Sequence, residues 1–176
     1  PNLYVDMDSI LFQSVIKVAV MIVSKYLSLD LDTESKLFQA KKVTGGITNA
    51  LFAVSGFTSN NNRSVFDSVL VRVFGAEGMI DRDVETSTFA CLCDAGIAPG
   101  YLGRFKNGRV ESWLENFVPL GFDELSNSNI SQKIARKMAE LHKLEVKGEL
   151  QKHHSKPGMW DQLFSWMEQA KTSSFK

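Results

Sequence analysis

The sequence has little of the features that mark specialised classes of protein. It has two cysteines and four prolines in 176 residues, and its 20 basic residues balance its 20 acidic ones, so the net charge is zero. A neutral chain lacks the electrostatic attraction expected of a protein whose main partner is nucleic acid or an anionic membrane. The hydrophobic fraction of 44% and the charged fraction of 23% are typical of ordinary globular proteins. Disorder, a collagen helix and a coiled coil are therefore excluded.

Disulfides, zinc and membrane spans are also not expected. The two cysteines, Cys91 and Cys93, lie one residue apart and could bond to each other only under severe strain. With no other cysteine in the chain, we interpret them as small apolar side chains rather than zinc ligands. The longest uninterrupted apolar run covers residues 18–23, far short of the roughly 20 residues that a spanning helix needs. Reduced thiols and the lack of a secretory framework favour the cytoplasm.

The spacing of apolar residues predicts helices mixed with short strands. Helical spacing covers residues 8–27, 81–95, 130–144 and 159–170, with a loop at 119–129. Strand-like runs cover 38–44, 47–55, 68–74, 100–105 and 109–117. Short connections favour an antiparallel sheet, and Asn107-Gly108 between the last two runs is a strong hairpin signal. The fold class is therefore α+β, with the element order of the small lobe of a protein-kinase-like fold.

A glycine pair lies where the first strand turns into the second. The segment at 44–49 reads Thr-Gly-Gly-Ile-Thr-Asn. Paired glycines allow positive φ and the close approach of a ligand, and hydroxyl and amide groups beside exposed N–H groups suit phosphate oxygens. A plain hairpin turn is the alternative, and these six residues alone favour it.

An arginine stands among apolar residues on the third strand. Period-two alternation places Arg72 on the same face as Leu70 and Phe74, so its permanent charge needs a partner. We expect that partner to be Glu85, beside the apolar stripe of the following helix. An arginine held in this way can offer a planar fork to phosphate oxygens. An edge-strand ion pair without a ligand fits the same residues equally well.

Six segments keep a recognisable order and separation. They are GGITNAL (45–51), VLVRVFG (69–75), IDRDVET (80–86), GIAP (96–99), FKNGRVESWLENFVPL (105–120) and IARKMAELHKLE (134–145). Each alone is a weak signal, but six in register are a strong one. Together they resemble the choline/ethanolamine kinase family, from about residue 30 to the end of the chain. The Asp-Arg-Asp at 81–83 and the Ser-Lys-Pro-x-x-Trp at 155–160 are more similar to the ethanolamine branch.

The resemblance implies roles for particular residues. It assigns a phosphate-covering loop made of Thr44, Gly45, Gly46, Ile47, Thr48 and Asn49. It makes Arg72 the strand arginine that meets the nucleotide phosphates and Glu85 the helix glutamate that pairs with it. It implies that backbone groups of Asn116, Phe117 and Val118 form the hinge that binds adenine.

The resemblance also implies a division of the chain and an activity. Residues 1–35 would form an N-terminal helical segment. Residues 36–118 would form the nucleotide-binding lobe, with a five-stranded antiparallel sheet and a glutamate-bearing helix. Residues 119–176 would lead toward a second lobe. The implied activity is phosphorylation of ethanolamine by ATP with Mg²⁺ in phospholipid synthesis. Choline is the alternative acceptor, and family members are often homodimers.

The chain departs from the family in lacking the catalytic residues. A kinase of this fold needs a catalytic aspartate and metal ligands from its large lobe. None of the three histidines is followed two places later by aspartate, and Asp161 is the only aspartate beyond Asp123. We therefore assign no catalytic or metal-binding residue and expect a fragment, inactive alone, whose last helices leave apolar faces uncovered. His153 and His154 are expected to be solvated in a linker. A non-catalytic nucleotide-binding or scaffold module, or a plain α+β domain, remains the alternative.

Overall fold

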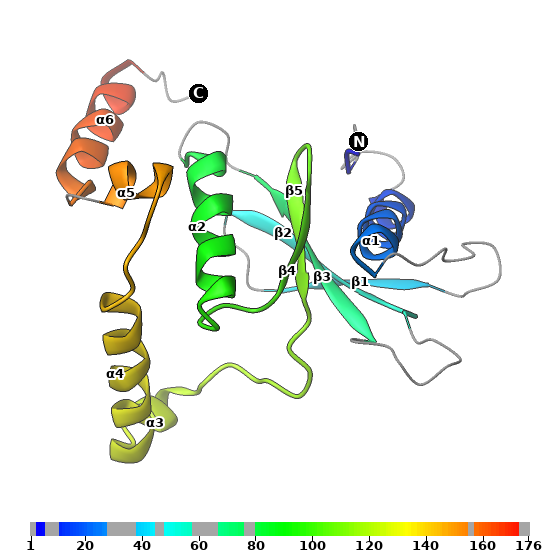
Figure 1. Cartoon of the computed structure of the whole chain (residues 1–176), viewed down its shortest axis with the longest axis horizontal. Helices are drawn as coiled ribbons and strands as arrows, with labels where there is room; N and C mark the ends of the chain where they lie inside the picture. The colour runs from blue at the N-terminus through cyan, green and yellow to red at the C-terminus, as the bar shows by residue number, and fades with distance from the viewer. Residues whose placement is uncertain are drawn as a thin grey trace.

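The computed structural model describes residues 3–5, 11–27, 38–44, 48–57, 67–75, 80–154 and 157–172. Its elements are α1 (Leu11–Leu27), β1 (Gln39–Val43), β2 (Asn49–Ser55), β3 (Ser68–Phe74), α2 (Arg82–Asp94), β4 (Tyr101–Phe105), β5 (Gly108–Ser112), α3 (Phe122–Leu125), α4 (Ser128–His142), α5 (Glu149–His154) and α6 (Met159–Thr172). Figure 1 shows one sheet flanked by α1 and α2, with α3 to α6 on the far side of α2.

The sheet is antiparallel throughout and has the strand order β1-β2-β3-β5-β4. The five-stranded antiparallel sheet is therefore confirmed. β3 lies at its centre and pairs with β5, so Arg72 of β3 stands directly opposite Arg109. The predicted strand over 109–117 was too long, because β5 begins at Gly108 and ends at Ser112. The pairing of β3 with β5 brings together two segments that are far apart in the sequence.

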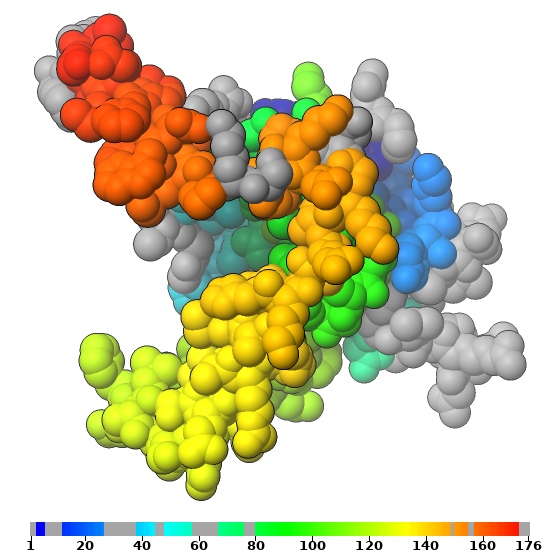
Figure 2. All heavy atoms as spheres, turned by 60° about the vertical axis from the view of Figure 1, so that its left-hand side comes forward, coloured from blue at the N-terminus to red at the C-terminus, as the bar shows by residue number. Residues whose placement is uncertain are grey.

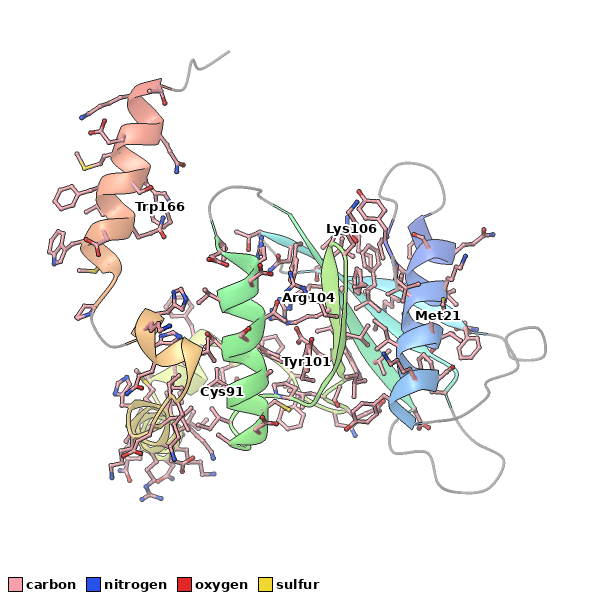
Figure 3. All side chains as sticks on the ribbon, turned by 45° about the horizontal axis from the view of Figure 1, so that its top comes forward. Met21, Cys91, Tyr101, Arg104, Lys106 and Trp166 are labelled. Carbon is pink, nitrogen blue, oxygen red and sulfur yellow. The ribbon has the colours of Figure 1, made fainter. Side chains whose placement is uncertain are left out.

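The two faces of the sheet have different chemistry. Along β3 every second residue is buried, and Val69, Val71 and Val73 each have an exposed fraction of at most 1%. Together with Phe52, Val54 and Val110 they form the apolar core with the buried side chains of α1. The intervening residues of β3, which include Arg72, point to the opposite face because side chains alternate along a strand. Figure 3 shows side chains filling the space on both sides, with Tyr101 and Arg104 between the sheet and α2.

Helix α2 begins and ends at residues that the sequence marks. Asp81 is its N-cap, and the side chain of Asp81 accepts hydrogen bonds from the backbone N–H groups of Asp83 and Val84, each at 3.0 Å. This cap satisfies donors that would otherwise have no partner in the first turn. After the C-cap, Gly96 has a φ of 69°, which glycine adopts at no steric cost. The helix predicted over 81–95 is thus confirmed.

The chain beyond the sheet is mostly helical and lies away from the sheet core. The predicted loop at 119–129 contains α3, and the predicted linker before residue 159 contains α5; both helices are shorter than two turns. Figure 2 shows α6 standing out from the rest of the molecule. Large apolar side chains of α6 are exposed, among them Trp160 at 58% and Phe164 at 59%. Among the described residues, no helix is both long enough and apolar enough to cross a bilayer.

Candidate functional site

A cluster of charged side chains occupies the sheet face that looks toward α2. Arg72 from β3 donates to the carboxylate of Glu111 on β5 through two nitrogens, with Nε to Oε1 at 2.6 Å and Nη2 to Oε2 at 3.3 Å. Arg109, two residues before Glu111, donates from Nε to the same Oε1 at 2.7 Å. One carboxylate therefore holds two guanidinium groups, and its bond to Arg72 is bidentate.

The same cluster continues onto α2. Glu85 accepts from Arg109 Nη1 at 3.2 Å and from Arg82 Nη1 at 2.6 Å. Arg82 also donates to the backbone carbonyl of Gly75, just after β3. The expected direct pair between Arg72 and Glu85 was wrong. Arg109 lies opposite Arg72 in the strand register and binds Glu85 itself, while Arg72 binds Glu111.

Burial and charge single out Arg72 within this cluster. The side chains of Glu111 and Arg109 are 2% and 5% exposed, whereas that of Arg72 is 23% exposed. The cluster contains three arginines and two glutamates and so carries one net positive charge. A partly buried surplus cation favours a nearby anion. In the described part of the chain, Nη1 of Arg72 has no hydrogen-bond partner, so Arg72 is the member best able to bind that anion.

Aromatic rings hold the two other arginines in place. The guanidinium of Arg109 lies 4.3 Å from the ring centroid of Phe89, and that of Arg82 lies 4.8 Å from that of Phe74. Such cation–π contacts orient the flat guanidinium groups. Partial burial alone would raise the pKa of Glu85, but the hydrogen bond from Arg82 and the charge of Arg109 outweigh it and hold this pKa below 4.5. Glu85 is therefore a stable anion between two arginines.

The C-terminal end of the glycine segment, at Thr48 and Asn49, lies next to this cluster. The backbone carbonyl oxygen of Thr48 accepts a hydrogen bond from the N–H of Gly75 at 3.0 Å. A Cβ at Gly75 would lie 2.9 Å from this oxygen. Asn49 begins β2, and its buried Oδ1 has no hydrogen-bond partner among the described residues. This oxygen is a hydrogen-bond acceptor, so only a donor group could satisfy it. Gly45, Gly46 and Ile47 lie outside the described residues.

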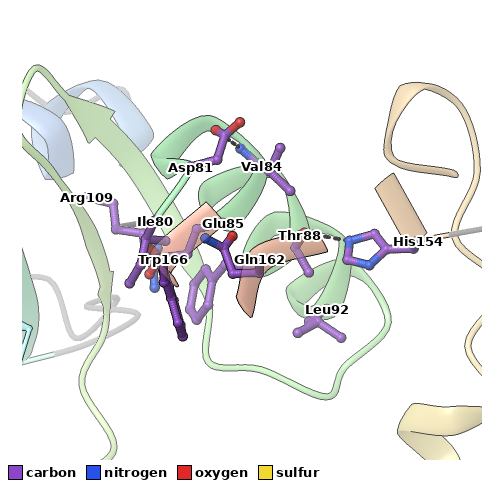
Figure 4. A pocket seen from close by; sticks show the side chains of 11 residues that line it. Ile80, Asp81, Val84, Glu85, Thr88, Leu92, Arg109, His154, Gln162 and Trp166 are labelled. Atoms are coloured by element: carbon purple, nitrogen blue, oxygen red, sulfur yellow. Dashed lines mark hydrogen bonds and ion pairs between the residues drawn. The ribbon is translucent and has the colours of Figure 1, made fainter. Parts of the chain in front are cut away.

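An open cavity of about 540 Å³ separates α2 from α5 and α6. Figure 4 shows Glu85 and Arg109 at one end, with Trp166 and Gln162 of α6 nearby. At the other end, Thr88 Oγ1 and His154 Nε2 lie 3.1 Å apart and share a hydrogen bond. His154 was expected to be solvated in a linker; it is exposed, but it belongs to α5 and has this partner.

A comparison with protein families matches residues 40–176 to the family described as choline/ethanolamine kinase. The chain belongs to this family. A probable ethanolamine kinase from Arabidopsis thaliana is 32% identical over 147 residues, which cover 82% of this chain and 37% of the relative. Probable choline kinase 2 from the same plant is 35% identical over 140 residues, covering 78% of this chain and 38% of the relative. The chain thus spans little more than a third of the length of these relatives.

Solved structures of this family share the fold. The ethanolamine kinase of Plasmodium vivax superposes with a TM-score of 0.69 at 20% identity, covering 98% of this chain and 48% of that structure. The choline kinase of Cryptosporidium parvum gives a TM-score of 0.63 at 23% identity, covering 88% of this chain and 43% of that structure. These neighbours confirm the protein-kinase-like fold of a family of transferases.

Three residues predicted from the kinase resemblance lie outside the sheet. Asn116, Phe117 and Val118 follow four to six residues after the end of β5 as chain outside the sheet. Asn116 has a φ of 61°, and the other two side chains are 74% and 79% exposed. The expectation of a strand reaching Phe117 was wrong because β5 ends at Ser112. Among the described residues, no three acidic, histidine or cysteine side chains group as a metal site would.

Sequence reasoning missed Arg109 and Glu111. Both lie in a segment predicted as a strand, and Val110 between them is fully buried against the apolar core. Period-two alternation would have placed these two charges together on the opposite face. Their partnership with Arg72 could not be found in the same way, because it depends on β3 and β5 being neighbours.

Proposed function

We propose that this chain is the nucleotide-binding lobe of an ethanolamine kinase, which transfers the γ-phosphate of ATP to the hydroxyl of ethanolamine in phospholipid synthesis. The observation that carries the proposal is the surplus positive charge at Arg72, beside the end of the glycine segment. Phosphoryl transfer requires fixed positive charge around the phosphates more than covalent help from the protein. Membership of the choline/ethanolamine kinase family supports the same activity.

The described residues fit the phosphates of ATP. Two nitrogens of Arg72 bind Glu111, and among the described residues its Nη1 has no partner, so this N–H edge can donate to phosphate oxygens. In this proposal Arg72 neutralises and orients the phosphates, while the segment from Thr44 to Asn49, including Gly45, Gly46, Ile47 and Thr48, covers them with its N–H groups. Glu85 keeps α2 tied to the sheet. No described residue is assigned as a ligand of Mg²⁺; a second lobe would hold the ion, which would supply further positive charge at the phosphates.

The remaining parts of the proposal follow the family resemblance. Residues 1–35 form an N-terminal segment, 36–118 the nucleotide lobe, and 119–176 the connection to a second lobe. Asn116, Phe117 and Val118 would form the adenine hinge. All three residues are exposed and lie beyond the end of the sheet. In this proposal the protein acts in the cytoplasm on small molecules and forms a homodimer in the manner of its family.

Choline is the second candidate acceptor. Relatives named for choline and for ethanolamine match this chain at similar identity, 35% and 32%. We favour ethanolamine because Asp81-Arg82-Asp83 and the Ser-Lys-Pro-x-x-Trp segment are more similar to that branch. Competition between the two amino alcohols in the whole protein would decide. A lower KM for choline would assign the protein to the choline branch.

The central test is the turnover of Arg72→Ala in the whole protein. We expect a loss on the order of 10²–10³-fold in kcat, since one group that stabilises transition-state charge is removed. Arg104→Ala is the matched control, because Arg104 also lies on this sheet face but makes an exposed ion pair with Asp83. Its loss should be less than about five-fold, as for surface ion pairs. Near-normal turnover of the Arg72 variant would refute the proposed role.

A further inference from the structure

The hydrogen bonds of Glu111 fix the orientation of the Arg72 side chain. Its two oxygens bind two different nitrogens of Arg72, Nε and Nη2. Because a guanidinium is planar, two parallel bonds along one edge fix both its position and its plane. The opposite edge of Arg72, with Nη1, is then directed away from Glu111, and no described residue binds it, so it can donate to an anion.

Burial makes this arrangement rigid. The side chain of Glu111 is 2% exposed, so water does not compete for its oxygens. A buried carboxylate is stable only when its charge is compensated, and here Arg72 and Arg109 together supply that compensation. If either arginine turned away, the buried carboxylate would lose part of its charge compensation. The free-energy penalty for that loss exceeds the net stabilisation that the hydrogen bond provides.

Arg109 connects this carboxylate to α2. Its Nε binds Glu111 while its Nη1 binds Glu85, so a single guanidinium bridges strand and helix. Arg109 is itself 5% exposed and stacks on Phe89 of α2. A shift of α2 would therefore reach Arg72 through Arg109 and Glu111 and not through a direct helix-to-Arg72 ion pair.

We propose that Glu111 is a positioning residue that aims Arg72 at the nucleotide phosphates, and that Arg109 relays the position of α2 to it. This inference rests on the proposed function, in which Arg72 meets those phosphates. The alternative is that Glu111 only stabilises the fold. The two readings differ because a positioning residue acts through Arg72, whereas a structural residue acts regardless of what occupies position 72.

A double-mutant cycle in the whole protein separates the two readings. Glu111→Gln keeps the shape of the side chain and removes its charge. We expect kcat to fall about ten-fold or more, the size expected for charge-assisted bonds to one guanidinium, with the KM for the acceptor unchanged. In an Arg72→Ala background, the same change should alter kcat less than about two-fold, because coupled residues are not additive. Glu115→Gln, an exposed glutamate just beyond β5, is the matched control and should have no effect.

Each outcome of the cycle has a distinct meaning. An equal loss of kcat from Glu111→Gln in both backgrounds would overturn the positioning role while leaving Arg72 in its place at the phosphates. Normal kcat for Glu111→Gln alone would also overturn it. Normal kcat for Arg72→Ala alone would instead overturn the proposed function, and the inference with it.

A second measurement on the unmodified chain does not depend on the variants folding. The Nε–H of Arg72 should give an NMR signal that exchanges slowly with water, because Glu111 holds it in a buried bond. The signal should persist when Mg-ATP is added, since the phosphates would meet the other edge of the guanidinium. The exposed Arg136 on α4 serves as the fast-exchanging reference. Loss of the slow Arg72 signal on addition of Mg-ATP would show that Glu111 releases Arg72, and would overturn the proposal.

Discussion

Replacing Gly108 by alanine should be among the most damaging single changes in the sheet. Gly108 is the first residue of β5 and follows the two-residue turn from β4. A Cβ at this position would lie 2.2 Å from the carbonyl oxygen of Arg72 and 2.3 Å from Cζ of Phe105. Both distances are far below ordinary van der Waals contact. The glycine that the sequence marks as a turn residue is thus required by the close approach of the neighbouring strand.

The size of the effect follows from what must move. The Phe105 ring could shift, but the Arg72 oxygen belongs to the backbone of the central strand, so relief requires β3 and β5 to separate. Overpacking costs up to about 3 kcal/mol, which for a chain of this length lowers the unfolding midpoint by roughly 6–12 °C. Because the separation occurs beside Arg72, the proposed binding of nucleotide at Arg72 should weaken as well.

Thermal unfolding of the Gly108→Ala variant, followed by circular dichroism, measures this effect. Gly121→Ala is the control, because its Cβ would meet only Oε2 of Glu124 at 3.5 Å, an ordinary contact. We expect the control to stay within about 0.5 kcal/mol of the original protein, as surface substitutions do. An unchanged midpoint for Gly108→Ala would refute the reasoning, because it would mean that the strands are not so close.

Three further predictions concern other elements. Asp81→Ala should lower the free energy of unfolding, measured in urea, by about 1 kcal/mol because α2 loses its N-cap. Asp81→Asn should keep most of this stability, because asparagine can also cap a helix. Asn107→Ala removes two hydrogen bonds to Val5, from Val5 N–H to Oδ1 at 3.0 Å and from Nδ2 to the Val5 carbonyl at 2.9 Å; amide exchange at Val5 should accelerate, and an unchanged rate would contradict this attachment. The pKa of Glu85 is lowered in the folded state, so its stabilising contribution is complete above pH 4.5 and disappears as the pH falls through the folded-state value. Urea titrations should therefore show a smaller loss of stability in acid for Glu85→Gln than for the original protein; equal losses would count against the ion pairs.

Local signals predicted much of the fold. The limits predicted for β3, residues 68–74, agree with the structure, and those of α2 agree within one residue at each end. Alternation along β3 and the cap at Asp81 act over a few residues, so the sequence alone reveals them. α5 was missed because six residues are too few to show a helical period. β5 was extended too far because the apolar residues Trp113, Leu114 and Phe117 continue the pattern after the chain has left the sheet.

The candidate site was predictable only in part. Arg72 stood out because a charge alternates with apolar neighbours within its own strand. Its partner was missed because Glu111 lies 39 residues further along the chain, and only the pairing of β3 with β5 brings the two together. The predicted pair of Arg72 with Glu85 was wrong, because the arginine of the sheet that binds Glu85 is Arg109. Partnerships of this kind depend on strand order, which local patterns do not encode.

The two-sidedness of β3 has a consequence for how the protein can change. Its valines pack in the apolar core against α1, and the residues between them, including Arg72, lie on the face with the charged cluster. An insertion or deletion of one residue within the strand would exchange these two sets of side chains. Arg72 would then point into the apolar core, and the valines would point toward the glutamates of the charged cluster. The number of residues in β3 is therefore constrained as well as the identity of its buried valines and of Arg72.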